Sequence, residues 1–164
     1  MSQNNTVAPK TIVIGLGNPI LADDGVGIYA LQELQKSVAH PDVTFMECSL
    51  AGFNLLDLLQ GYQKAIIIDS IKTGKGEIGE VYRLDIDSLF STVRLASVHE
   101  INFATALELG RMMDLDMPSD IEIYVVEVED NSTFREGCCA KVAAAIPVIK
   151  EAVIKSLEKI YGKV

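Results

Sequence analysis

The amino-acid sequence predicts an α/β protein with three layers, in which about five strands form a mostly parallel, twisted sheet between helices. Two observations lead to this class. Short apolar runs rich in β-branched residues alternate along the chain with longer segments whose apolar residues recur every three or four positions. The apolar runs are also continuous, which is typical of parallel strands covered on both faces.

Residues 11–15 form the first predicted strand, because the run Thr-Ile-Val-Ile-Gly is β-branched and stops at a glycine-rich turn. A loop and then a helix follow. Either Asp23 or Asp24 is suited to cap the start of this helix. The apolar face of this helix consists of Val26, Ile28, Ala30, Leu31 and Leu34.

The same alternation continues to the end of the chain. Further strands are predicted at residues 43–48, 65–69, 81–84 and 121–128, and helices at residues 53–59 and 101–113. The last segment, from Val142 to Ile160, has helical spacing. Pro147 lies inside it and should kink this helix or split it in two, because proline removes a backbone donor.

Length and composition indicate one compact unit. The chain has 164 residues, which is enough for one core but not for two, and 49% of them are hydrophobic. We expect a flexible tail at residues 1–10 and a single domain at residues 11–164.

Charge and cysteine content exclude several classes of function. The 23 acidic residues outnumber the 14 basic ones, and no stripe of Lys and Arg is present to neutralise phosphates. We therefore expect that the protein neither binds nucleic acid nor inserts into a membrane. No apolar run is long enough to span a bilayer, residues 1–10 lack an apolar signal segment, and the three cysteines form no Cys-x-x-Cys pair, so a cytoplasmic location is expected.

Three residues are the candidates for a functional site: Asp24, Asp69 and His99. Asp24 follows the first strand, Asp69 ends the third, and His99 precedes the helix that begins near residue 100 or 101. Ligands of open parallel sheets bind beyond the carboxyl ends of the strands, where these three residues are expected to meet. Two carboxylates and an imidazole suit nickel, zinc or iron when water or a substrate completes the shell.

The same three residues have other interpretations. The two carboxylates can instead act as a base and an electrostatic stabiliser, with His99 as the proton donor to a leaving amine. A purely structural interpretation makes Asp24 a helix cap, Asp69 a turn residue and His99 a helix-start residue.

Other kinds of site have weaker support. Residues 15–20 suggest a dinucleotide-binding loop, but Ile20 stands where a small residue is needed and Pro19 stiffens the loop. No Gly-x-Ser-x-Gly elbow is present, and Cys48 is a cysteine nucleophile only in principle. The acidic residues of the last strand, from Glu122 to Asp130, suggest a partner surface or simple alternation along a strand.

The run Gly15-Leu-Gly17-Asn-Pro-Ile-Leu-Ala-Asp23-Asp24-Gly25-Val-Gly27 closely resembles the opening signature of the nickel-iron hydrogenase maturation endopeptidases. Asp24 matches the second acidic position of that signature, Asp69 the acid that ends the third strand, and His99 the histidine before the next helix. The resemblance extends from about residue 11 to the last helix.

The resemblance implies a specific activity. Members of the family are endopeptidases that remove a short C-terminal peptide from the nickel-loaded precursor of the hydrogenase large subunit. In that case Asp24, Asp69 and His99 are both the catalytic and the metal-contacting residues, and the nickel is supplied by the substrate rather than permanently bound.

Two segments depart from the family pattern, at residues 48–52 and 126–130, and both are expected to line the substrate groove. A non-catalytic nickel or large-subunit chaperone on the same fold is the alternative function.

Overall fold

The computed structural model describes residues 8–49, 54–87 and 98–164. Within these ranges the strands are β1 (Thr11–Leu16), β2 (Val43–Cys48), β3 (Lys64–Ile71), β4 (Val81–Leu84) and β5 (Asp120–Glu127). The helices are η1 (Ala22–Gly25, a 3-10 helix), α1 (Val26–Gln35), α2 (Asn54–Leu59), α4 (Val98–Met112), α5 (Ala140–Ala143) and α6 (Ala145–Tyr161). No helix in the described part of the chain is both long and apolar enough to cross a membrane.

The strands form one sheet in the order β2-β1-β3-β5-β4. The first four of these pair in parallel, and β4 pairs with β5 antiparallel. All eight residues of the central strand β3 are buried, which explains its continuous apolar sequence. The predicted five-stranded, mostly parallel sheet is confirmed.

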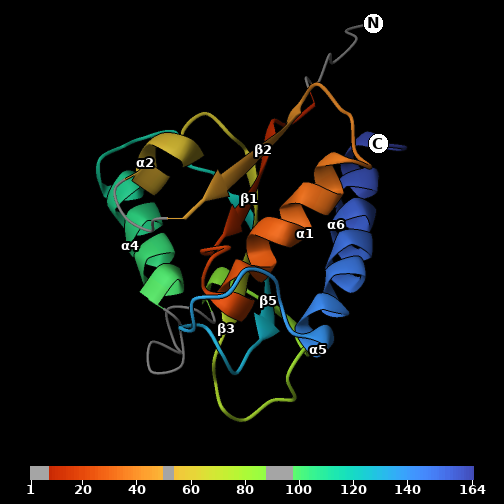
Figure 1. Cartoon of the computed structure of the whole chain (residues 1–164). Coiled ribbons are helices and arrows are strands. Elements are labelled where there is room, and N and C mark those ends of the chain that lie inside the picture. Colours follow the sequence, from red (N-terminus) through yellow and green to blue (C-terminus); the bar gives the residue numbers. More distant parts are fainter. Residues whose placement is uncertain (1–7, 50–53, 88–97) are drawn as a thin grey trace, which may run out of the picture.

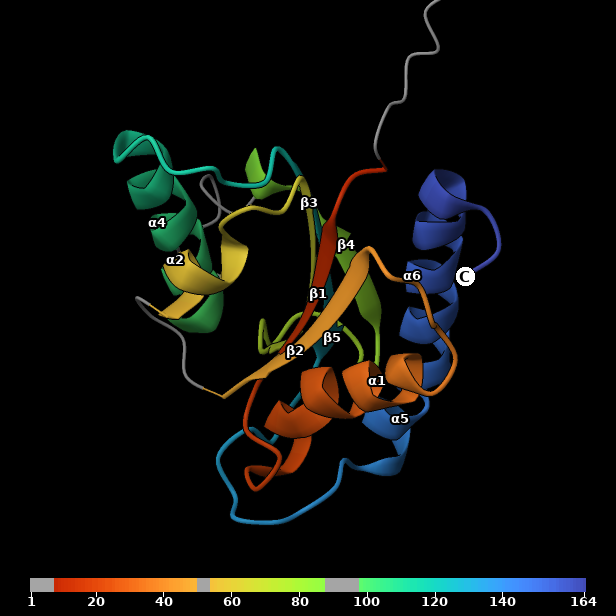
Figure 2. The same cartoon turned by 90° about the horizontal axis from the view of Figure 1, so that it is seen from above.

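Helices cover both faces of the sheet. Helices α1, α5 and α6 lie on one face, and α2 and α4 lie on the other, so that the molecule has three layers (Figures 1 and 2). Because β1, β2, β3 and β5 run in the same direction, their carboxyl ends meet at one edge. The start of α1 and the first turn of α4 lie at this same edge (Figure 1).

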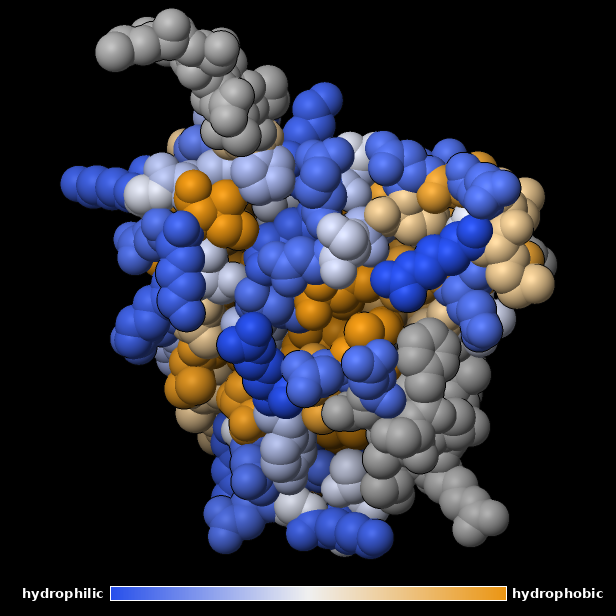
Figure 3. Space-filling model, turned by 180° about the vertical axis from the view of Figure 1, so that it is seen from behind, coloured by the Kyte–Doolittle hydropathy of each residue, from blue (hydrophilic) through white to orange (hydrophobic). Residues whose placement is uncertain are grey.

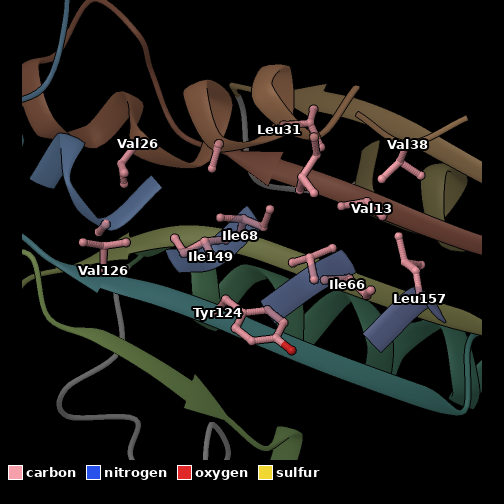
Figure 4. Close-up of a cluster of buried hydrophobic side chains, with 14 of the residues drawn as sticks. Val13, Val26, Leu31, Val38, Ile66, Ile68, Tyr124, Val126, Ile149 and Leu157 are labelled. Carbon is pink, nitrogen blue, oxygen red and sulfur yellow. The ribbon is translucent and has the colours of Figure 1, made fainter. Parts of the chain in front are cut away.

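Each face of the sheet has its own apolar core. The core under α1 and α6 joins residues of these helices and of the sheet, among them Val13, Leu31, Ile66, Tyr124 and Ile149 (Figure 4). The core under α2 and α4 takes the alternate residues of the same strands, such as Ile14 and Ile67. Successive side chains of a strand point to opposite faces, so a continuous apolar run fills both cores.

The last helical segment is split, as the position of Pro147 predicts. Helix α5 ends at Ala143 and α6 begins at Ala145, which makes Pro147 the third residue of α6. Backbone N–H groups of a first helical turn have no partner within the helix, so the missing donor of proline costs nothing there. The break therefore precedes the proline by one turn.

Long-range hydrogen bonds hold the described residues that precede β1. Of the tail expected to be flexible at residues 1–10, the structure describes only the last three residues, and the others lie outside the described part. The carbonyl of Pro9 accepts a hydrogen bond from the Tyr161 hydroxyl, and the N–H of Lys10 donates to the side chain of Gln63 (2.8 Å). Contacts with residues far along the sequence hold this segment, so local composition did not reveal them.

The β4 edge of the sheet is the side that Figure 3 presents. Apolar side chains gather in a hollow at the centre of this face, with polar side chains around it (Figure 3). β4 itself is only partly covered, since Val81, Tyr82 and Leu84 are half-buried and Arg83 is exposed.

The packing of α6 against the sheet leads to a test of stability. Ile149 is fully buried in the core under α1, whereas its neighbour Val148 is 53% exposed. Ile149→Ala should lower the free energy of unfolding by about 2–5 kcal/mol, because it removes buried methylene groups and leaves a cavity. Val148→Ala, the matched control, should change it by less than about 0.5 kcal/mol. Urea denaturation measures both values, and equal losses would contradict the assigned face of α6.

Candidate functional site

Glycines let the loop after β1 approach the ends of the strands. A Cβ atom on Gly27 would lie 2.3 Å from the carbonyl oxygen of Leu16 and 2.5 Å from that of Ile68, so only glycine lets α1 start directly against β1 and β3. Gly17 has a φ of +135°, and a Cβ there would lie 2.0 Å from the Asp24 carbonyl oxygen. These contacts bring Asp24 to the carboxyl end of β3.

Asp24 lies in η1 and is 7% exposed. Its Oδ2 atom accepts a hydrogen bond from the N–H of Asn18 (2.9 Å), and its Oδ1 atom accepts one from the hydroxyl of Ser70 (3.2 Å). The cap position of α1 is Gly25, without a side-chain hydrogen bond. The interpretation of Asp24 as a helix cap is therefore wrong, because its carboxylate faces the loop and β3 instead of the helix N-terminus.

Asp69 is fully buried inside β3, which continues to Ile71. The residue is in register with Val125 of β5, and its Oδ1 atom accepts a hydrogen bond from the N–H of Ser70 (2.7 Å). Asp69 therefore neither ends the strand nor forms a turn, and both of those predictions are wrong. The pairing with β5 extends the strand past the last residue of the apolar run.

Ser70 links the two carboxylates, and the sequence analysis did not select it. Its N–H donates to Asp69 and its hydroxyl to Asp24, while only 3% of the residue is exposed. The available signal was the position of a small polar residue directly after a buried apolar run. Alternation along β3 places Asp69 on the face covered by α4, and Ser70 on the face covered by α1.

His99 lies in the first turn of α4, since this helix begins at Val98. The predicted helix began two or three residues later, a difference within the normal uncertainty of helix ends. This turn is at the same edge of the sheet as Asp24 and Asp69 (Figure 1). The side chain of His99 lies outside the described residues, so its part in the site stays a prediction.

The described side chains include no group of three His, Cys, Asp or Glu residues that could hold a metal ion. Asp24 and Asp69 supply two oxygen donors, and the third predicted ligand, His99, is not among these side chains. Carboxylate oxygens fit a hard or borderline cation such as nickel. A metal site of three protein ligands therefore stays a prediction.

Two of the acidic residues considered for a partner surface, Glu122 and Glu127, are buried in β5. The Glu127 carboxylate is fully buried and accepts hydrogen bonds from the N–H and hydroxyl groups of Thr73 (both 2.8 Å). Glu122 is buried at the other end of β5. Burial alone would raise its pKa, but hydrogen bonds from Lys64 and Ser156 outweigh burial and lower the pKa below its ordinary value. Both carboxylates therefore have structural roles.

The chemistry of Cys138 argues against a reactive thiolate. Burial, reinforced by the nearby Asp23 carboxylate, raises the pKa of the Cys138 thiol to about 12. Cys48, the cysteine considered as a nucleophile from the sequence, is buried at the end of β2. These cysteines are core or near-core residues.

The loop after β1 does not suit a dinucleotide. The N–H of Asn18 donates to the Asp24 carboxylate, so a negative charge already lies where a pyrophosphate would need donors. Ile20 is 46% exposed and does not pack between helix and strand as the small residue of a nucleotide loop does.

The chain also matches a model of a known protein family. A model of the hydrogenase maturation protease family matches residues 28–156. This range contains Asp69 and His99 and starts four residues after Asp24.

Individual relatives cover most of the chain. The hydrogenase expression/formation protein HupD of Rhizobium leguminosarum bv. viciae is 25% identical over 92% of this chain and 75% of its own length. The hydrogenase 2 maturation protease of Escherichia coli (strain K12) is 25% identical over 92% of both chains. The chain spans only 57% of the length of another HupD, that of Thiocapsa roseopersicina. The two are 27% identical over 74% of this chain.

Solved structures share the fold. The hydrogenase maturating endopeptidase HybD from E. coli superposes with a TM-score of 0.82 at 24% identity, covering 92% of this chain and 93% of that one. The [NiFe] hydrogenase maturation protease HybD from Thermococcus kodakarensis gives a TM-score of 0.75 at 22% identity, with 90% and 98% covered. At these identities the likeness establishes the fold.

The link through Ser70 can be tested by stability. Ser70→Ala should lower the free energy of unfolding by about 1–3 kcal/mol, because the buried Asp24 carboxylate loses a donor. Ser156→Ala is the matched control, since Ser156 is also buried and its hydroxyl donates to a buried carboxylate, that of Glu122 (2.7 Å). Urea denaturation of both variants should give comparable losses. An unchanged Ser70→Ala protein would mean that the serine does not hold Asp24.

The raised pKa of Cys138 predicts low reactivity. At about pH 9 iodoacetamide should modify Cys138 much more slowly in the folded protein than in urea, where the thiol has an ordinary pKa of about 8.5. Because the folded pKa is the higher one, this group's contribution to stability is lost as the pH rises from about 8.5 towards 12. Peptide mass analysis of a Cys139→Ser variant measures the rate at Cys138 alone. Equal rates in the folded and unfolded chain would contradict the pKa shift.

Proposed function

Because this chain belongs to the hydrogenase maturation protease family and is a peptidase, we propose that it removes a short C-terminal peptide from the precursor of a nickel-iron hydrogenase large subunit. We further propose that the precursor is cleaved only after it has received nickel. The observation that carries the proposal is the pair of buried carboxylates, Asp24 and Asp69, joined by Ser70 at the carboxyl edge of the sheet.

The carboxylate pair suits a cationic group of the substrate. Burying an ionised carboxylate is costly unless an opposite charge lies nearby, so a cation brought by the substrate would stabilise the buried pair. The hydrogen bonds from Asn18 and Ser70 fix the orientation of Asp24 before any substrate arrives. A preorganised pair of this kind discriminates between a nickel-loaded and an empty precursor, because only the loaded one brings the missing positive charge.

The nickel in this proposal belongs to the substrate. Asp24, Asp69 and His99 are the residues that would contact it, and together they offer too few ligands to complete a shell without the precursor. When bound, nickel supplies Lewis-acid polarisation of the scissile carbonyl or of a water molecule. The protein's own part is to orient the carboxylates, to exclude water around Asp69 and to bring His99 within reach of the leaving amine.

The conditions of the reaction follow from composition. With no helix of the described residues able to span a membrane, and with cysteines that favour a reducing compartment, we place the reaction in the cytoplasm. The precursor is expected to be a folded protein whose C-terminal extension reaches the carboxyl edge of the sheet.

The proposal is tested by the mass of a large-subunit precursor incubated with this protein, with and without prior nickel loading. We expect loss of a C-terminal peptide only from the loaded precursor. Asp24→Ala and Asp69→Asn should each reduce the rate by on the order of a hundredfold or more while leaving the fold intact.

Two controls separate chemistry from folding. Asp120→Asn removes a carboxylate at the opposite end of the sheet and should leave the rate unchanged. Ser70→Ala should slow cleavage whereas Ser156→Ala, of comparable stability, should not. A stable complex whose precursor keeps its full mass would reject the endopeptidase and favour a chaperone of the large subunit.

A further inference from the structure

Two large apolar side chains are exposed beside the loop that carries Asp24. Phe134 is 82% exposed and Ile20 is 46% exposed. Ile20 precedes Asp24 by four residues, and Phe134 belongs to the segment that leads from β5 to α5. We call these two residues the Ile20–Phe134 ledge.

Backbone hydrogen bonds join the two halves of the ledge. Leu21 and Arg135 form a parallel bridge, in which the N–H of Arg135 donates to the carbonyl of Ile20 (3.0 Å) and the N–H of Ala22 donates to that of Arg135 (2.8 Å). Ile20 and Phe134 directly precede the bridged residues, so their backbones are neighbours. Figures 1 and 2 both show the segment after β5 running alongside the loop after β1.

The segment that carries Phe134 is anchored at both ends. The Asp130 carboxylate accepts hydrogen bonds from the N–H groups of Ser132 (3.3 Å) and Thr133 (3.0 Å), and its carbonyl accepts one from the N–H of Asp23 (3.0 Å). Beyond Phe134, the N–H of Cys139 donates to the Asp23 carboxylate (2.7 Å). The ledge is thus held in place before binding, which reduces the entropy lost when a partner covers it.

The other exposed apolar side chains do not lie on this loop; Met46, for example, is 36% exposed in β2. Met112 and Met113 are 76% and 58% exposed at and just after the C-terminus of α4, which lies at the opposite edge of the sheet (Figure 1). Val148 is exposed on α6, away from the loop after β1. Isolated exposed apolar residues are ordinary, but a pair fixed to the loop of a buried carboxylate is a candidate anchor for a partner.

The charge around the ledge indicates the chemistry of that partner. Glu129 and Glu136 are exposed on either side of Phe134, with Arg135 as the one exposed basic residue between them. The whole chain has a net charge of -9. A complementary surface therefore offers an apolar hollow for the phenyl ring with Lys or Arg residues at its rim.

We propose that the Ile20–Phe134 ledge docks the folded body of the protein substrate, next to the point where its C-terminal extension enters the carboxylate site. This inference rests on the proposed function and adds to it a specific surface. The ledge is continuous with the loop that positions Asp24, so docking there sets the distance between the substrate body and the carboxylate pair. In this arrangement the ledge recognises the substrate body, and the carboxylate pair contacts the nickel.

The test compares Phe134→Ser and Ile20→Ser with Met113→Ser, the matched control at the other edge. All three side chains are at least partly exposed, so each variant should stay folded, which urea denaturation checks. Cleavage of the nickel-loaded precursor should show a KM raised about tenfold or more for Phe134→Ser, a smaller rise for Ile20→Ser, and an unchanged kcat for both. Met113→Ser should match the wild type.

Binding is measured separately, by surface plasmon resonance with an uncleaved precursor. Weaker binding of Phe134→Ser, together with wild-type association that slows as salt is added, supports the ledge. If the wild type binds the precursor in this way but does not cleave it, only the endopeptidase proposal fails. Cleavage by the wild type with the same KM in Phe134→Ser overturns the ledge and leaves the endopeptidase intact. Self-association of the wild type that Phe134→Ser abolishes also overturns it, because the ledge would then bind a second copy of this chain.

Discussion

The close approach of α1 to the ends of β1 and β3 is the constraint on which the site depends. The backbone at Gly27 lies so near the carbonyl oxygens of Leu16 and Ile68 that no side chain fits. This contact fixes η1, and with it Asp24, over the end of β3, where Ser70 reaches the Asp24 carboxylate. A larger residue at position 27 would move the helix away and separate the two carboxylates. The glycines of the signature are thus packing residues whose effect is to assemble a polar site.

The two ends of the sheet hold buried charge in different ways. At the amino end, Lys64 pairs with Glu122 (2.7 Å), and Ser156 and Tyr124 donate further hydrogen bonds to the same carboxylate. That group is complete, and its role is structural. At the carboxyl end, Asp24 and Asp69 share one small donor residue and face the edge where ligands of parallel sheets bind. Of these two groups of buried charge, the one at the carboxyl end is therefore the one suited to receive a cationic substrate group.

Much of the fold was predictable because its signals are local. The β-branched run of β3, the helical spacing of α1 and the break before Pro147 depend on neighbours within one or two turns of chain, and the structure confirms them. The predictions that failed depended on distant partners. Asp24 looked like a helix cap because the strand that supplies its hydroxyl donor is more than forty residues away. Glu127 looked like surface charge because the turn that buries it comes from before β4.

By itself the sequence determined the α/β class and the family, and it predicted Asp24 and Asp69 as site residues, because hydrophobic periodicity and the glycine-acid signature involve adjacent positions. Only the tertiary structure decided how these acids are held. Ser70 joins them because strand alternation turns its hydroxyl towards Asp24 on one face of β3, while its backbone N–H donates to Asp69 on the other face. The anchored exposure of Phe134 is likewise tertiary, because hydrogen bonds between segments more than a hundred residues apart hold the loop beside η1.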